Sequence, residues 1–199
     1  MIKNKRDLRY YLEADKISMD VSGKRPHRIS RYESDVIWKL QRALRYTEYY
    51  HNCRSHGLFR IVYKAWQYRL FTLQMKTGMH IPINVFGPGL SISHIGPIVI
   101  NGFARVGKNC RLHPMTCIGV NGHTNEVANI GDNVYVSTGA KIIGPVKIAD
   151  GVCIGANAVV TKDIDEANST WGGVPAKKIS DLGTPMPKNR YGADIAKKK

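Results

Sequence analysis

The sequence predicts a mainly β protein with a helical front end, in which an α-helical N-terminal domain precedes a triangular parallel β-helix. Two observations support this prediction. Before residue 80, apolar residues recur at three- and four-residue intervals, which is typical of amphipathic helices. After residue 80, they recur every six residues, a period that fits neither a helix nor an alternating strand. We therefore expect a helical domain over 1–80, a β-helix over 81–166, and a C-terminal loop and basic tail over 167–199.

The N-terminal domain is predicted to contain three or four helices. A turn or linker is expected at Ser22–Pro26, where Gly and Pro interrupt the pattern. Helical spacing is clearest in two segments and weaker in a third, and the residues that show it are Val36, Ile37, Leu40, Ala43 and Leu44, then Phe59, Val62, Trp66, Leu70 and Leu73, and finally Leu8, Tyr11 and Leu12.

The second part is predicted to be a solenoid of very short strands, with three flat faces in each coil. The aliphatic position of each repeat must point into the prism. The alternative fold, an antiparallel β-sandwich, would not keep so many such positions in register. One step is twelve residues long, and there Val120–Asn129 is expected to form a loop pushed out of the coil. The inward positions are Ile100, Val106, Leu112, Ile118, Ile130, Val136, Ile142, Ile148, Ile154 and Val160.

Composition excludes several classes of protein. The chain has 199 residues, which is long enough to bury a core. Its hydrophobic content of 43% is too high for a disordered protein. It has no apolar run approaching the roughly 20 residues of a membrane span, and no hydrophobic leader follows Met1–Arg6, so we expect a cytoplasmic protein. The four cysteines form no C-x-x-C pair, so we expect reduced thiols and no metal site.

The net charge is strongly positive and unevenly distributed. The chain has 30 Lys and Arg against 15 Asp and Glu, so the balance is 30 − 15 = +15. Residues 1–80 hold 17 of the basic and 7 of the acidic residues, a balance of +10. Such charge suits nucleic acid, an anionic membrane surface or a phosphorylated ligand. Because no zinc set, RNA-binding aromatic motif or recognition-helix signature accompanies it, we predict no nucleic-acid partner.

Several motifs resemble the serine O-acetyltransferase-like family of left-handed β-helix (hexapeptide-repeat) acyltransferases, including the branch found with surface-polysaccharide biosynthesis. The segment Leu12–Asp15 also resembles the helical front end of that family. The resemblance implies a left-handed β-helix, acetyl-CoA as co-substrate, and a homotrimer or a dimer of trimers. The motifs that support it are Gly87–His94, Ile98–Asn101, Ile130–Tyr135, Gly139–Gly144, Ile154–Val160 and Gly173–Lys177.

Acetyl transfer from a thioester to a hydroxyl needs a base for the hydroxyl proton and stabilisation of the oxyanion. Histidine suits the first task, and the resemblance implies that His94 is the general base. With both substrates bound together, direct transfer needs no acyl-enzyme. The runner-up base is His123, which lies in the extruded loop.

The resemblance implies an acceptor-binding role for Asp15. Ser93 beside the candidate base, His113 at an outward position and His123 in the loop are further candidates for binding the acceptor. The chain also departs from the serine enzymes. Their Asp immediately before the histidine is replaced by Ser93, their upstream Asp falls on Met79, and their Arg-His pair falls near Glu126 and Val127. A carboxylate that would orient His94 is therefore missing or displaced. Two acceptors remain open: L-serine, and a sugar hydroxyl of a surface-polysaccharide precursor.

The thioester donor is expected in the groove between adjacent prisms of a trimer. Small residues at such places would let the ligand approach the main chain. By resemblance, backbone at Val120, Thr138 and Ala156 would bind the pantetheine arm, and Gly173, Val174, Pro175, Ala176 and Lys177 would wrap the adenine end. The tail that ends Lys197–Lys199 is expected to be mobile.

Overall fold

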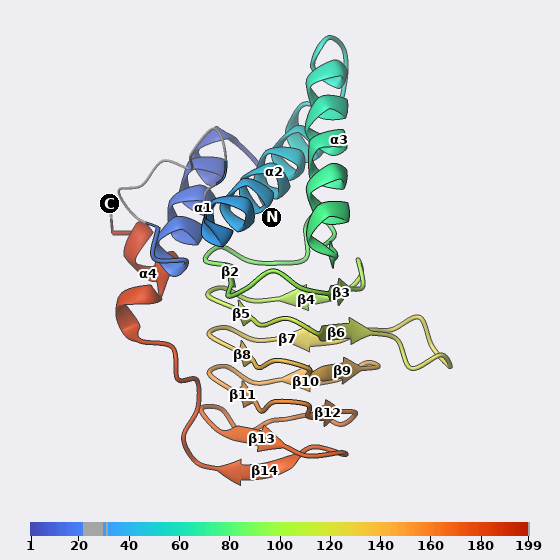
Figure 1. Ribbon diagram of the computed structural model, residues 1–199, viewed down its shortest axis with the longest axis vertical. Helices are drawn as coiled ribbons and strands as arrows, with labels where there is room; N and C mark the ends of the chain where they lie inside the picture. The colour runs from blue at the N-terminus through green and yellow to red at the C-terminus, as the bar shows by residue number, and fades with distance from the viewer. Residues whose placement is uncertain (22–29, 31, 199) are drawn as a thin grey trace.

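The computed structural model describes residues 1–21, 30 and 32–198 (Figure 1). Three helices come first: α1 (Lys5–Ser18), α2 (Glu33–Cys53) and α3 (Phe59–Thr77). The helical segments predicted from spacing are therefore confirmed. The three helices cover one end of a stack of short strands. The turn predicted at Ser22–Pro26 lies outside the described residues.

The ends of the helices follow local chemistry. The side chain of Asn4 caps α1 by accepting a hydrogen bond from the backbone N–H of Asp7 at 2.9 Å. Helix α3 ends at Gly78, whose φ of 70° is left-handed and suits glycine. The chain then enters β1 one residue later, so the helical layer joins the strands directly.

The strands form three sheets, which are the faces of a triangular prism. All pairings are parallel except that of β13 with β14. The first face consists of β1 (Met79–His80), β3 (Ile98–Ile100), β6 (Thr116–Gly119), β9 (Lys141–Ile143) and β12 (Val159–Val160). The second face consists of β4 (Arg105–Val106), β7 (Asn129–Ile130) and β10 (Lys147–Ile148). The third face consists of β2 (Ser91–Ile92), β5 (Arg111–Leu112), β8 (Tyr135–Val136), β11 (Cys153–Ile154), β13 (Thr170–Gly172) and β14 (Lys177–Ser180).

The interior of the prism is the core that the six-residue period predicted. All ten inward positions are at most 5% exposed. They also stack in register: Ile118 pairs with Ile100 on one side and with Ile142 on the other. Burying each such side chain contributes roughly 1.5–3 kcal/mol, so this ladder supplies much of the stability of the coils.

The C-terminal segment returns to the helical layer (Figure 1). A short helix, η1 (Lys188–Arg190), is followed by α4 (Gly192–Ala196), which packs on α1. The hydroxyl of Tyr10 donates to the carbonyl of Ala193 at 3.0 Å, and the ammonium of Lys108 lies 2.6 Å from Asp194. The expectation of a mobile tail is therefore wrong up to Ala196, because these groups fix the segment. The domain boundaries at residues 80 and 166 stay a prediction.

Candidate active site

The predicted base lies at one corner of the prism. His94 follows β2 on the third face and precedes β3 on the first face. We call the column of turns at this corner the His94 edge; it comprises residues 93–97, 113–115, 137–140, 155–158 and 173–176. Backbone hydrogen bonds tie each turn to the next, from Met115 N to Pro97 O, Gly139 N to Pro114 O, Asn157 N to Thr138 O, and Val159 N to Gly173 O. Four steps of about 4.8 Å give the edge a length of about 19 Å.

A carboxylate from the helical domain holds His94. Nδ1 of His94 lies 3.1 Å from Oε2 of Glu33, the first residue of α2. The other carboxylate oxygen accepts a hydrogen bond from the backbone N–H of Ile95. These bonds, first that of Ile95 and then that of His94, lower the pKa of Glu33. When Nδ1 donates to Glu33, Nε2 is the nitrogen that can accept a proton, and the imidazole, 65% exposed, is open to a substrate.

Sequence reasoning missed Glu33. At Ser93 and Met79 the sequence lacks the carboxylates of the serine enzymes. The structure instead places beside His94 the carboxylate of Glu33, which is 61 positions away in sequence. The only available signal was an acidic residue at the start of a predicted helix, which by itself indicates no more than a favourable helix N-terminus.

A second histidine, His113, lies on the next coil and contacts Ser93. The Oγ of Ser93 lies 3.1 Å from Nε2 of His113, whose ring centroid is 4.9 Å from that of Tyr135. Burial, followed by the charges of Arg111 and His94, lowers the pKa of His113 to about 4. His113 is therefore neutral near pH 7, so its Nε2 can accept the Ser93 hydroxyl proton in a hydrogen bond. The structure brings Ser93, His94 and His113 together at the His94 edge.

Part of the predicted donor site lies further along the same edge. Thr138 and Ala156 are exposed at equivalent turns of successive coils, and Oγ1 of Thr138 donates to the carbonyl of Pro114 at 3.0 Å. Gly173–Lys177 lies at the far end, where Ala176 N donates to Val159 O. A cavity of about 300 Å³ opens there. Its lining includes Trp171, Pro175, Ala176 and Lys177.

Val120 and His123 lie at a different corner. Val120 follows β6, where the chain leaves the first face, and the turn of the next coil there is joined by a bond from Gly144 N to Gly119 O. The loop from Val120 to Ala128 projects from the body (Figure 1), as predicted. Asn121 orders its start by accepting bonds from the backbone N–H groups of His123 and Thr124. Within one chain, the structure therefore does not bring His123 or Val120 to the His94 edge.

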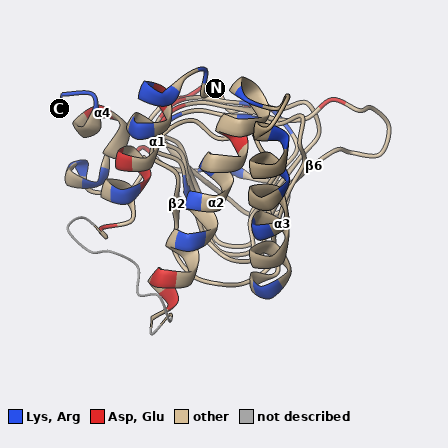
Figure 2. Ribbon diagram, turned by 90° about the horizontal axis from the view of Figure 1, so that it is seen from above, with Lys and Arg blue, Asp and Glu red and all other residues tan. Residues whose placement is uncertain are grey.

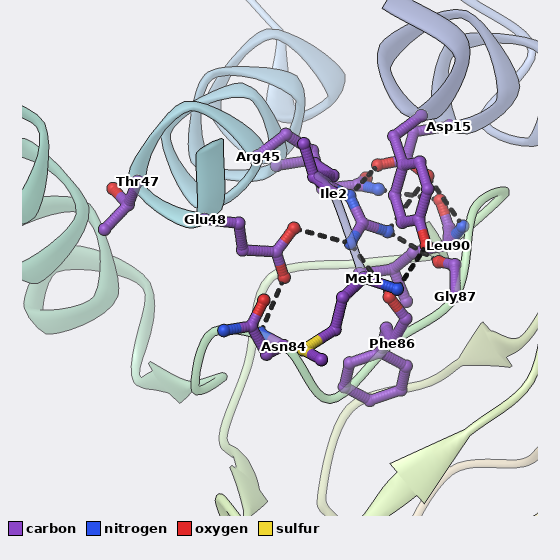
Figure 3. A network of polar contacts seen from close by, with 12 residues as sticks. Met1, Ile2, Asp15, Arg45, Thr47, Glu48, Asn84, Phe86, Gly87 and Leu90 are labelled. Atoms are coloured by element: carbon purple, nitrogen blue, oxygen red, sulfur yellow. Dashed lines mark hydrogen bonds and ion pairs between the residues drawn. The ribbon is translucent and has the colours of Figure 1, made fainter. Parts of the chain in front are cut away.

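Asp15 occupies a buried network between the helices and the first coil (Figure 3). Its side chain is fully buried, and its Oδ2 lies 2.8 Å from Nε of Arg45. Its Oδ1 accepts from the backbone N–H groups of Gly89 and Leu90 at 2.8 and 2.9 Å. Burial raises the pKa of Asp15, which the charge of Arg45 opposes. An acceptor amine would reach this carboxylate only if these contacts broke.

Arg45 connects that network to further groups. It is fully buried and also lies 3.0 Å from Oε2 of Glu48. Its guanidinium donates to the carbonyl oxygens of Phe86 and Gly87 at 2.9 and 2.7 Å. The segment that it holds continues into β2 and His94, so the network fixes the approach of the chain to the candidate base.

Two further searches concern metals and membranes. Among residues 1–21, 30 and 32–198, no group of three or more His, Cys, Asp or Glu side chains is arranged to hold a metal ion. In the same part of the chain, no helix has the length and apolar character of a membrane span.

The fold defines a class of protein, the left-handed β-helix proteins built from hexapeptide repeats, and residues 128–162 match the family described as bacterial transferase hexapeptide (six repeats). A serine acetyltransferase of Staphylococcus xylosus is 32% identical over 146 residues, which cover 69% of this chain and 67% of the relative. The chain therefore belongs to the serine O-acetyltransferase-like family of hexapeptide acyltransferases, and the predicted resemblance and fold class are confirmed.

Two other relatives extend the comparison. A serine acetyltransferase of Mycobacterium tuberculosis is 35% identical over 114 residues, which cover 56% of this chain. The chain spans about half of that relative, 49% of its length. A crystal structure of a serine acetyltransferase from Brucella abortus in complex with coenzyme A has a TM-score of 0.64 at 22% identity, and the match covers 90% of this chain and 68% of the other. At that identity the likeness supports the fold.

Proposed function

We propose that the protein is an O-acetyltransferase that moves acetyl from acetyl-CoA to the hydroxyl of L-serine. The observation that supports this most directly is the pairing of Glu33 with His94 at the edge where the thioester site was predicted. The family relation and the coenzyme A complex of the Brucella abortus relative favour the same donor. L-serine is the acceptor that the names of the relatives indicate.

His94 acts as the general base in a direct transfer. Nε2 of His94 takes the proton of the acceptor hydroxyl while the hydroxyl oxygen attacks the thioester carbonyl carbon. The tetrahedral intermediate then expels the thiolate of coenzyme A, which recovers the proton from the imidazolium. Glu33 keeps the imidazole in the tautomer with Nε2 unprotonated and stabilises the positive charge that develops on it. Binding both substrates at one edge supplies the proximity that direct transfer requires.

The acceptor lies beside Ser93 and His113, and the donor lies along the edge. Ser93 and neutral His113 offer a hydroxyl and a ring nitrogen for hydrogen bonds to a polar acceptor. The acyl arm passes the exposed turns at Thr138 and Ala156 towards the cavity at Gly173–Lys177. There the ammonium of Lys177 favours an anionic nucleotide end, whereas that of Lys178 is already paired with Glu166 and Asp181. Val120 and His123 would join this site from a neighbouring copy in a homotrimer or a dimer of trimers. This assembly would act in the cytoplasm.

A sugar hydroxyl of a surface-polysaccharide precursor is the second candidate acceptor. The ammonium of L-serine needs a carboxylate, but the carboxylate of Asp15 is already bonded to Arg45 and to two backbone amides. Among the described residues, the carboxylate hydrogen-bonded to His94 is that of Glu33, and it is engaged by His94 and Ile95. A neutral hydroxyl acceptor avoids this requirement.

The test follows release of the coenzyme A thiol with a chromogenic disulfide, first with L-serine and then with nucleotide sugars. We expect release with serine, and a loss of 10²–10⁴-fold in kcat for His94→Ala, the range of a general base. His56→Ala is the matched control, because His56 is an exposed histidine in the loop between α2 and α3. Unchanged turnover in His94→Ala would refute the mechanism. Release with a nucleotide sugar and none with serine would move the acceptor to the second candidate.

A further inference from the structure

Arg111 is an outward-pointing cation on the third face, beside the candidate acceptor site. It is the first residue of β5, and its side chain is half-buried on the outer surface while the next residue faces the interior. It pairs with Ser91 on the preceding coil and with Tyr135 on the following one. His113 lies two residues further along, about 7 Å away at the rise of a strand. Arg111 therefore shares a surface with the contact between Ser93 and His113.

The guanidinium of Arg111 is held in place by neutral groups. Its Nη1 donates to the Oγ of Ser91 at 3.0 Å, and that hydroxyl donates in turn to the carbonyl of Ser18 at 3.2 Å. The hydroxyl of Tyr135 also lies nearby. A guanidinium has five N–H donors in one plane, so these contacts orient the group and leave donors available for a ligand.

This cation has no counter-ion in the described part of the chain. Among residues 1–21, 30 and 32–198, Arg111 forms no ion pair with a carboxylate. A second cation, Arg190, lies close by and pairs with Asp20 instead. Burial, followed by the charge of Arg190, lowers the pKa of Arg111, yet a guanidinium stays protonated at neutral pH. Basic residues also outnumber acidic ones in the helical layer above the coils (Figure 2), so the surroundings favour an anion.

We infer that Arg111 binds a carboxylate of the acceptor, an inference that rests on the proposed function. A guanidinium matches a carboxylate through two parallel N–H···O bonds, which fix its orientation as well as its distance. The α-carboxylate of L-serine is such a group, and a sugar acceptor meets the same requirement as a uronic acid. With the carboxylate at Arg111, the hydroxyl of a small acceptor extends along the face towards Ser93 and Nε2 of His94.

A neighbouring copy in the proposed homotrimer is the other source of a carboxylate for Arg111. The loop that this copy would bring to the His94 edge, residues 120–128, contains one acidic residue, Glu126. In its own chain Glu126 lines a cavity together with Lys147, which offers it a cation. The acceptor is favoured over Glu126 because Arg111 lies two residues from His113, on the surface next to the candidate base.

The experiment compares acceptors that differ only in the carboxylate, in the thiol-release assay. L-serine is paired with L-serinamide, and UDP-glucuronate with UDP-glucose. Arg111→Gln should raise KM for the carboxylate-bearing acceptor about 10–100-fold, the range of a hydrogen bond to a charged group, with little change in kcat or in KM for acetyl-CoA. Its KM for the uncharged member of each pair should change little. Arg111→Lys keeps the charge and should recover part of the loss.

Arg105→Gln is the matched control, because Arg105 is the exposed first residue of β4 on the second face. It should behave like the unmodified protein. An equal rise in KM for both members of a pair would overturn the inference, since Arg111 would then act only through the structure. Sedimentation velocity showing that Arg111→Gln and Glu126→Gln each dissociate an oligomer would also overturn it, because a neighbouring copy would then hold Arg111.

Calorimetric titration with L-serine and UDP-glucuronate separates this inference from the proposed function. Binding that weakens in Arg111→Gln, without thiol release from any acceptor, would refute the acetyl transfer and support the carboxylate site. Thiol release with UDP-glucose alone would support acetyl transfer and overturn the carboxylate site. Neither binding nor release with folded protein would overturn both.

Discussion

Asp15→Asn should destabilise the protein strongly, because Asp15 is the carboxylate that joins α1, Arg45 and the first coil. The substitution removes the charge that faces the buried guanidinium at 2.8 and 3.2 Å and leaves two amide donors competing for one neutral oxygen. Breaking a buried ion pair costs about 3–5 kcal/mol when one charge is left unpaired. Glu48 still lies 3.0 Å from Arg45, so we expect the lower end, about 3 kcal/mol.

Urea unfolding followed by circular dichroism measures this loss. With a slope of about 3 kcal/mol per molar urea, the midpoint should fall by about 1 M. Asp20→Asn is the matched control, because Asp20 pairs with Arg190 while 70% exposed, and it should cost less than about 1 kcal/mol. A midpoint within the error of the unmodified protein, together with a raised KM for the acceptor, would refute the reasoning and favour Asp15 as an acceptor-binding residue.

Three further predictions concern the edge and the core. Glu33→Gln should lower kcat about 10–100-fold with little change in KM or in urea midpoint, because it alters the tautomer control of His94 and not the core; an unchanged kcat contradicts the orienting role. The depressed pKa of His113 means that the unfolded chain binds more protons between about pH 4 and 6.5, so stability falls as pH drops through this window. His113→Gln should remove about 1 kcal/mol of that fall, after allowance for solvent screening, and parallel pH curves of unfolding free energy would contradict it. Ile142→Ala, at a fully buried position, should cost about 2–5 kcal/mol in urea unfolding, and a cost below 1 kcal/mol would mean that the inward ladder is not the core.

The β-helix could be predicted in detail because its signal is local and repeated. Each inward side chain recurs after six residues, and a single error of register would have exposed several of them. Ile118 and Ile142 keep their pairing although the coil between them contains the extruded loop. The loop itself was visible as the interval in which no aliphatic residue occupied the expected position.

The helical domain could be predicted as helices but not as a set of contacts. Apolar spacing showed which faces of α1 and α2 turn inward, yet nothing in it distinguished Asp15 as a buried residue from an acidic residue on a helix surface. The partner of Asp15 is Arg45, 30 residues away, and the pair is satisfied only when the first coil supplies two amides. The docking of α4 on α1 was missed for the same reason, since a short polar segment has no period to interpret.

The carboxylate hydrogen-bonded to His94 comes from the helical domain, whereas the β-helix has Ser93 and Met79 at the positions where the resemblance implied a carboxylate. Glu33 begins α2, and Arg45, three turns further along the same helix, is fixed by Asp15 and by the carbonyls of Phe86 and Gly87. Those carbonyls belong to the segment that leads into β2 and then into His94. Helix α2 therefore contacts the chain at two places near the candidate base. Arg45 binds the segment that precedes His94, and Glu33 binds His94 itself and the next residue, Ile95. The distance between Glu33 and His94 is consequently set by the packing of α2 on the first coil, which ties the candidate chemistry to the interface between the two parts of the chain.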